Sequence, residues 1–474
     1  MIGRRQEIER LRRAYESSQS EFVVVYGRRR IGKTFLVNEM FGGRYVFQHA
    51  GVENVGMKDQ LAYFRDSLLR AGHRKCPRLS NWREAFYELA TFLESCSQTR
   101  KVVFLDEVPW LDTAKSGFLP ALEHFWNGWA CLRKDVLLII CGSATSWVVN
   151  EVLAARGGLY NRVTVPLAMA PFTLHECAEY VRWKGLPFDA LQILECYMAL
   201  GGVAYYWSIL EPQMSAAQNL NALFFARNAP LRDEFNRLFA SLFKRTDKYV
   251  QIVDLLSAKA GGMTRDELLL AMPSPCGGEI SRYLRELEEC GFVLKCNVFG
   301  TIKKGAIYKL IDNFVFFHRQ FLGIPRGGDE SFWLTAYTTP QVNVWRGLSF
   351  ERVCFGHVRQ IKTALGISGI RTDVYSWRAK ADSGVARSDA QIDLLIERAD
   401  RTISICELKY SGEDEYGFTK DERDKLHRRG RLFVEVTNTK KNVCYVLVTT
   451  TGLKRNEYAG SVQNVVTLDD LFRE

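Results

Sequence analysis

The first residues suited to chemistry lie near the N-terminus, where glycines, basic residues and a hydroxyl follow a β-branched run at residues 23–25. Glycines let backbone N–H groups turn inward on phosphates, at the positive end of a following helix. A lysine there can reach the β- and γ-phosphates, and a threonine hydroxyl can ligate Mg²⁺. The spacing Gly-x4-Gly-Lys-Thr therefore predicts a site for ATP, held by Gly27, Arg28, Arg29, Arg30, Ile31, Gly32, Lys33, Thr34 and Phe35.

A second stretch is the apolar run at residues 102–105, which ends in Asp106 and Glu107. We expect Asp106 to hold Mg²⁺ through water and Glu107 to orient or deprotonate the attacking water. This requires the strand before Asp106 to be adjacent and parallel to the strand before the glycine-rich loop, so that both ends reach one metal.

The continuous apolar run at residues 136–141 is typical of a strand buried on both faces of a parallel sheet. It ends in small polar residues, of which Ser143 or Thr145 could sense the γ-phosphate. A simple strand-end cap is the alternative. We include Ser143 in the predicted nucleotide site.

The order of these motifs resembles the archaeal-type ATPases of the AAA+/STAND-related P-loop group, over about residues 1–240. The further matches are Gly3-Arg4-x-x-Glu7, Leu159-Tyr160-x-Arg162, Pro171-Phe172-x3-Glu176 and Gly201-Gly202-Val203. The resemblance implies an ATPase core at 1–171 and a helical lid at 172–245. It also implies that the Gly-Arg box packs near the adenine. One departure is Ala204, where the family often has proline.

The same resemblance makes Arg162 a candidate arginine finger, which stabilises transition-state charge on a neighbouring subunit's nucleotide. That role implies a possible homo-oligomer. The alternative is an arginine on a solvated loop.

Residues 246–322 read as three helices followed by a hairpin, the pattern of a winged helix-turn-helix. Thr264 and Glu267 form a capping box that opens the second helix. The third helix mixes arginines with glutamates, whereas the hairpin is basic, with Lys295, Lys303, Lys304 and Lys309. Contact with DNA and a protein-interaction or linker role both stay open, because phosphate affinity needs clustered positive charge.

Residues 330–474 carry a second candidate site. Glu351 lies on a predicted helix that starts at residue 345, and Asp393 interrupts an apolar strand. After a turn, Glu407 and Lys409 interrupt the next strand, where positions i and i+2 share a face. Acids are costly inside core strands unless they are paired. A hairpin with an odd-length loop would place Asp393 opposite Glu407, where two carboxylates can hold Mg²⁺.

This arrangement resembles the PD-(D/E)XK nuclease superfamily, and in particular the domain often fused behind archaeal-type ATPases. The resemblance implies catalytic roles for Glu351, Asp393, Glu407 and Lys409, with metal on Asp393 and Glu407. The alternative is a buried lysine–carboxylate pair in a catalytically inactive fold, because fold does not imply function. The basic helix at residues 420–431 could follow a phosphate backbone or simply be solvated.

Length and charge are consistent with several domains and with nucleic acid as a partner, since the 474 residues carry a net charge of +10. The twelve cysteines include no Cys-x-x-Cys pair, so we expect neither a zinc site nor a disulfide framework. No apolar run approaches the ~20 residues of a membrane span, which predicts no membrane association and a cytoplasmic location.

The sequence thus predicts an α/β protein with ATP and Mg²⁺ as cofactors. ATP binding and hydrolysis would gate or assemble a Mg²⁺-dependent nuclease acting on nucleic acid, DNA rather than RNA. The alternative is an ATP-switched regulatory or DNA-binding protein whose nuclease-like domain is inactive.

Overall fold

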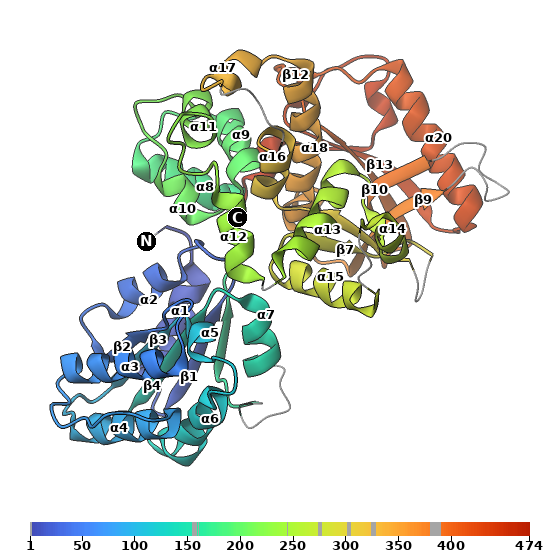
Figure 1. The fold of residues 1–474 in the computed structure, drawn as a ribbon. Helices are drawn as coiled ribbons and strands as arrows, with labels where there is room; N and C mark the ends of the chain where they lie inside the picture. The colour runs from blue at the N-terminus through green and yellow to red at the C-terminus, as the bar shows by residue number, and fades with distance from the viewer. Residues whose placement is uncertain are drawn as a thin grey trace. The chain divides into compact units, whose positions relative to one another are not determined.

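The computed structural model describes residues 2–153, 159, 161–243, 245–273, 277–300, 305–323, 329–379 and 390–474. The chain forms two compact units, residues 1–171 and residues 172–474. The first unit is built on one parallel sheet, and the second unit contains a five-stranded mixed sheet and smaller sheets (Figure 1).

The first unit is built on a five-stranded parallel sheet in the order β2-β3-β4-β1-β5, which confirms the predicted α/β class. Its strands are β1 (Glu21–Tyr26), β2 (Tyr45–Ala50), β3 (Lys101–Asp106), β4 (Val136–Gly142) and β5 (Val165–Ala168). The prediction that the strands before the glycine-rich loop and before Glu107 are adjacent is wrong, because β4 lies between β1 and β3. The buried run of β4 fits this central position, with all seven of its residues buried.

Helices cover both faces of this sheet (Figure 1). On β1, Val23 and Val25 pack on the face of α1 (Arg5–Glu16) and α2 (Lys33–Phe41), whereas Phe22 and Val24 pack on the other. That other face is covered by α3 (Met57–Ala71), α4 (Trp82–Ser95) and α6 (Phe118–Gly128). Burial on both faces explains why the strands are continuously apolar rather than alternating.

The second unit begins with a group of helices, as expected for residues 172–245. They are α8 (Leu174–Lys184), α9 (Ala190–Leu200), α10 (Ala204–Ser208), α11 (Ala216–Phe224) and α12 (Glu234–Leu242). Their apolar faces belong to one large core that continues through the rest of the unit.

Three further helices and a small sheet follow. The helices are α13 (Thr246–Ala258), α14 (Arg265–Ala271) and α15 (Ile280–Glu289); the antiparallel strands, in the order β6-β8-β7, are β6 (Met263–Thr264), β7 (Val293–Cys296) and β8 (Ile307–Leu310). The predicted capping box of Thr264 and Glu267 is confirmed. Lys303 and Lys304 lie outside the described residues.

The last part of the second unit contains a mixed sheet in the order β15-β13-β11-β10-β9. Its strands are β9 (Thr372–Ala379), β10 (Ala390–Arg398), β11 (Thr402–Lys409), β13 (Asn442–Thr449) and β15 (Asn464–Val466). Helix α18 (Pro340–Gly356) packs on the face of Cys406 and Leu408, and α20 (Lys420–Thr437) packs on the face of Ile403 and Ile405. Helix α18 begins at residue 340, five residues before its predicted start.

Strand β10 is irregular at Asp393. Its pairing with β9 shifts between Ile392 and Leu395, so that Asp393 and Leu394 together oppose Ser376. This is a β-bulge, which re-aims side chains and leaves one residue outside the regular ladder. Accordingly, Ile392 and Leu394 pack in different hydrophobic clusters, although residues two apart in a regular strand share a face.

In the part of the chain that the structure describes, no helix combines the length and the apolar character that crossing a membrane requires.

Candidate functional site

The loop after β1 depends on two glycines. Gly27 has φ +140°, and a Cβ built on it would lie 2.3 Å from the carbonyl oxygen of Met169. Gly32, just before α2, has φ +92°. Only glycine adopts both conformations without strain, so the loop can bring its backbone close to a ligand.

Lysine and threonine of the motif lie where α2 begins. The buried ammonium of Lys33 donates to the carbonyl oxygens of Gly27 at 2.9 Å and Arg28 at 2.8 Å. The Thr34 hydroxyl donates to Asp106 Oδ2 at 2.8 Å, although β4 separates their strands. A hydroxyl beside a carboxylate is a hard-oxygen donor set, and this set fits Mg²⁺.

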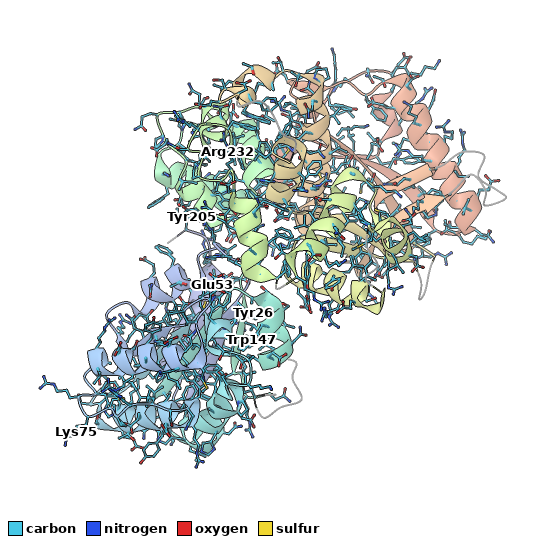
Figure 2. The ribbon with its side chains drawn as sticks, viewed as in Figure 1. Tyr26, Glu53, Lys75, Trp147, Tyr205 and Arg232 are labelled. Atoms are coloured by element: carbon cyan, nitrogen blue, oxygen red, sulfur yellow. The ribbon has the colours of Figure 1, made fainter. Side chains whose placement is uncertain are left out.

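Glu107 follows β3 in a left-handed conformation, with φ +45°. Its Oε2 accepts hydrogen bonds from the Ser143 hydroxyl at 2.8 Å and from the Ser143 backbone N–H at 3.3 Å. Ser143 comes directly after β4, so the central strand fixes the direction of the Glu107 carboxylate. Tyr26 and Trp147 lie at this same end of the sheet (Figure 2).

Arg4, from the start of the chain, contacts the glycine-rich loop. Arg4 is buried, donates to the Ile31 carbonyl oxygen at 3.3 Å and pairs with Glu7 at 3.5 Å. The Gly-Arg box therefore contacts the phosphate loop directly.

The other predicted residues of the nucleotide site differ in exposure. Phe35 is 58% exposed, and Arg162 is exposed. The remaining predicted loop residues are buried or half-buried; they are Arg28, Arg29 and Arg30.

A cavity of 780 Å³ opens beside Thr34 and Asp106, between β2 and α3. Burial lowers the pKa of His49 on its wall to about 4, so this imidazole is neutral near pH 7. The end of the loop at Thr34 and Asp106 is therefore flanked by open space on the β2 side.

The second unit brings Glu407 and Lys409 together, as predicted for positions i and i+2 of one strand. Lys409 Nζ lies 3.2 Å from Glu407 Oε1 and 3.8 Å from Glu422 Oε1. Arg429 of α20 donates to Glu407 Oε2 at 2.6 Å. Both oxygens of Glu407 therefore face cations.

Asp393 has a different cationic partner. Lys309 Nζ of β8 donates to Asp393 Oδ1 at 2.8 Å, and Gln391 Nε2 donates to the same oxygen at 2.6 Å. Lys309 is 2% exposed, so the expectation that it contributes to a basic hairpin surface is wrong, whereas the choice between DNA contact and a protein-interaction or linker role stays open. In the antiparallel register of β10 and β11, Leu394 pairs with Cys406. Asp393 and Glu407 are the residues adjacent to this pair, one on each strand.

Glu351 of α18 completes a group of three carboxylates. Burial and the negative charge of Asp393 raise the pKa of the Glu351 carboxyl well above its ordinary value. Glu407 adds to this increase, whereas Arg352 and Lys309 oppose it. Asp393 and Glu407 are therefore both close enough to affect the protonation of Glu351.

A cavity of 430 Å³ opens at Glu407 and Lys409, and basic residues prevail on its wall. Four of the six charged residues that line it are cations: Lys409, Lys425, Arg428 and Arg429. The sequence indicated a basic helix here but did not assign Gln391, Glu422 or Arg429 to the site. The helical spacing of Lys425 and Arg429 was the available signal, since residues i and i+4 share a helix face.

Comparison with known proteins assigns the N-terminal part of the chain. Residues 1–208 match the family model of an ATPase domain predominantly from Archaea. The uncharacterized protein MJECL04 of Methanocaldococcus jannaschii is 24% identical over 334 residues, covering 68% of this chain and 68% of that protein.

Two solved structures resemble this chain more distantly. The Walker-type ATPase paby2304 of Pyrococcus abyssi has a TM-score of 0.47 and 16% identity, covering 67% of this chain and 95% of that one. The ORC2 protein of Aeropyrum pernix, solved as ADPNP–ADP complexes, has a TM-score of 0.41 and 14% identity, covering 66% and 91%. On the strength of the family match, residues 1–208 contain an ATPase domain of the archaeal type.

Proposed function

We propose that this protein hydrolyses ATP at the Thr34–Asp106 site and uses the resulting change to control a metal-dependent nuclease site at Glu407 and Lys409. The nuclease part of this proposal rests on the cavity beside Glu407 and Lys409, where carboxylates, a lysine and further cations meet. A phosphodiester backbone is a polyanion, and clustered lysine and arginine supply the affinity for it.

In the first unit, the side chains of the nucleotide site would have separate roles in ATP hydrolysis. Lys33 would leave the carbonyl oxygens of Gly27 and Arg28 for the β- and γ-phosphates. Thr34 and Asp106 would hold Mg²⁺, which neutralises charge that develops on the phosphates. Glu107 would accept a proton from the attacking water, in the direction that its hydrogen bond to Ser143 sets.

In the second unit, Asp393 and Glu407 would hold a divalent ion, and their carboxylate oxygens fit Mg²⁺ or Mn²⁺. Such an ion polarises a phosphoryl oxygen and lowers the pKa of bound water. Lys409 would orient the water or stabilise the transition-state phosphate. Arg429 would release Glu407 and bind a phosphate of the nucleic acid instead. Residues 246–322 would act as a winged-helix connector.

A second candidate function is supported by the cation pairs themselves. Lys309 lies on Asp393, and Arg429 and Lys409 lie on Glu407, so the carboxylates are neutralised without any metal. A chain that keeps these pairs permanently would be an ATP-switched protein that binds nucleic acid at the α20 cavity without cutting it.

A cleavage assay separates the two functions. Purified protein is incubated with DNA or RNA, Mg²⁺ or Mn²⁺, and ATP, beside Lys409→Ala and the exposed control Lys420→Ala. Cleavage that Lys409→Ala abolishes while ATP turnover and Lys420→Ala stay normal supports the nuclease. Metal-independent DNA binding with no cleavage in any combination supports the binding protein.

A further inference from the structure

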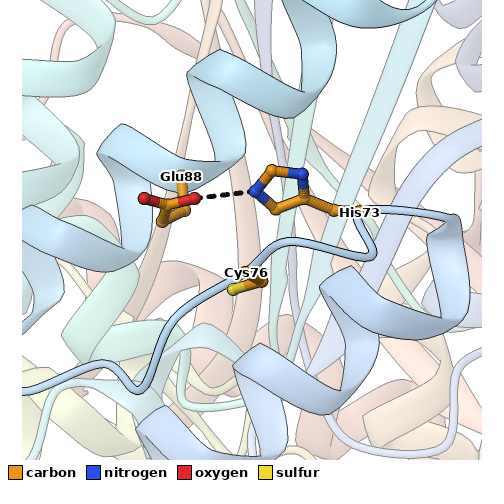
Figure 3. A group of neighbouring side chains, drawn as sticks. All are labelled: His73, Cys76 and Glu88. Atoms are coloured by element: carbon orange, nitrogen blue, oxygen red, sulfur yellow. Dashed lines mark hydrogen bonds and ion pairs between the residues drawn. The ribbon is translucent and has the colours of Figure 1, made fainter.

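A group of metal-ligating side chains lies away from both sites, in the first unit, where the loop after α3 meets α4 (Figure 3). Helix α3 ends at Ala71 and is capped by Gly72, which has φ +112°; His73 and Cys76 follow in the loop. Glu88 comes from the second turn of α4 and points toward them (Figure 3).

The three donor atoms are close together. His73 Nε2 and Glu88 Oε2 are 2.7 Å apart, and these atoms and Cys76 Sγ all lie within 4.8 Å of one another. The side chains of His73 and Glu88 are 13% and 16% exposed, and Cys76 is 4% exposed. The cluster is therefore largely shielded but still reachable by an ion.

The loop is held in place before any ligand binds. Arg65 Nε donates to the carbonyl oxygens of Cys76 at 3.2 Å and Pro77 at 2.8 Å, and the Cys76 N–H donates to the His73 carbonyl oxygen at 3.2 Å. Lys75, between the two loop ligands, is exposed on the outer surface of the unit (Figure 2). A fixed loop loses little conformational entropy when it binds an ion.

We propose that His73, Cys76 and Glu88 bind a transition-metal ion of the Zn²⁺ type. Tetrahedral Zn²⁺ bonds imidazole nitrogen and carboxylate oxygen at about 2.0–2.2 Å and thiolate sulfur at about 2.3 Å. Ligand atoms on such an ion are roughly 3–4 Å apart, so His73 and Glu88 need only separate slightly and Cys76 approach. A thiolate with an imidazole selects Zn²⁺ over Mg²⁺ and Ca²⁺, which prefer oxygen. Three protein ligands leave a fourth position for water.

This proposal departs from the expectation that the chain has no zinc site. That expectation rested on the absence of Cys-x-x-Cys pairs, whereas here the ligands are His-x-x-Cys in the loop and a glutamate twelve residues further on. Bound metal would fasten the loop to α4 more strongly than the His73–Glu88 hydrogen bond alone.

Cobalt absorption tests the site, because Co²⁺ replaces Zn²⁺ and a thiolate ligand gives a charge-transfer band in the near ultraviolet. The oxygen donors at Thr34 and Asp106, or at Asp393 and Glu407, cannot give that band. Metal-stripped, reduced full-length protein should bind about one Co²⁺ per chain with the band, and Zn²⁺, but not Mg²⁺, should remove it.

Cys76→Ser should abolish the band, and the half-buried control Cys96→Ser should keep it. Glu88→Gln should weaken Co²⁺ binding by more than about 100-fold, since even an outer-shell partner contributes about 10–100-fold. If the wild-type protein shows no thiolate band with Co²⁺, or if Cys96→Ser removes it, the three residues are not a metal site. The wild-type spectrum and Glu88→Gln decide the question even if Cys76→Ser does not fold.

Discussion

The ammonium of Lys309 on β8 lies 2.8 Å from the carboxylate of Asp393 on β10, and only 2% of Lys309 is exposed. This ion pair joins the small antiparallel sheet to the mixed sheet. It also means that the acid expected to bind metal is already neutralised by a residue from another part of the chain. Removing one partner of such a pair leaves the other charge without compensation.

Lys309→Met should therefore destabilise the second unit by about 3 kcal/mol, as typical for breaking a buried pair. Urea denaturation measures this change. The exposed Lys295 provides the control, and Lys295→Met should change stability by less than about 0.5 kcal/mol. Lys309→Met combined with Asp393→Asn should recover part of the loss; a double variant as unstable as the sum of both singles would contradict the pairing.

Glu107→Gln should reduce ATP turnover by about 100-fold or more while ATP still binds, because it removes the base but keeps the side-chain shape. Ser143→Ala should have a smaller effect, about tenfold, because it only frees the Glu107 carboxylate to rotate. Steady-state hydrolysis and nucleotide titration separate the two. Equal loss of binding and turnover in Ser143→Ala would show that Ser143 acts on the nucleotide instead.

Arg162 is exposed, and we expect it to act on a neighbouring subunit. Arg162→Ala and Lys33→Ala should each lose ATP turnover. Mixing the two should restore part of it, because the Lys33→Ala subunit supplies an arginine to the intact loop of its neighbour. A mixture as inactive as its components, under conditions where the wild-type protein assembles, would rule out an arginine finger in trans.

Arg429 and Arg428 provide a matched pair on α20. Both line the 430 Å³ cavity, and Arg429 donates to Glu407 at 2.6 Å. Either arginine changed to Met should weaken DNA binding and reduce its salt dependence. Arg429→Met should also increase the affinity for Mn²⁺, since it releases Glu407 Oε2. Calorimetric titration of both variants with Mn²⁺ tests this, and equal metal affinities would contradict it.

His318 should make stability depend on pH. Burial lowers its pKa from 6.5 to about 4, although its hydrogen bond to the Arg232 carbonyl oxygen opposes the shift. Between pH 6.5 and 4 the unfolded chain binds this proton and the folded chain does not, so stability falls as the pH falls. The loss should be roughly 1–3 kcal/mol. Denaturation across this range should show a smaller decrease in His318→Gln.

The parts of the fold that depend on neighbouring residues could be predicted from the sequence. The glycine-rich loop, the capping box at Thr264 and the i, i+2 pairing of Glu407 with Lys409 are all set within a few residues. The short turn between β10 and β11 also made the approach of Asp393 and Glu407 predictable.

What the sequence did not predict depends on residues far apart in the chain. The position of β4 between β1 and β3 follows from sheet order, which no local pattern specifies. Lys309 looked like a surface lysine because its partner, Asp393, lies 84 residues away. Glu88 likewise has ordinary helical surroundings, and its connection to His73 and Cys76 depends on how α3 and α4 pack.

The bulge at Asp393 and Leu394 has a consequence for protein engineering. Deleting one residue between Ile392 and Leu395 would restore uninterrupted pairing with β9 and regular alternation of faces. The aspartate would then no longer be aimed toward Lys309 and Glu351, and the buried ammonium of Lys309 would lose its partner. A regular ladder and the buried ion pair therefore make opposite demands on this single position, so a design that straightens the strand must replace Lys309 as well.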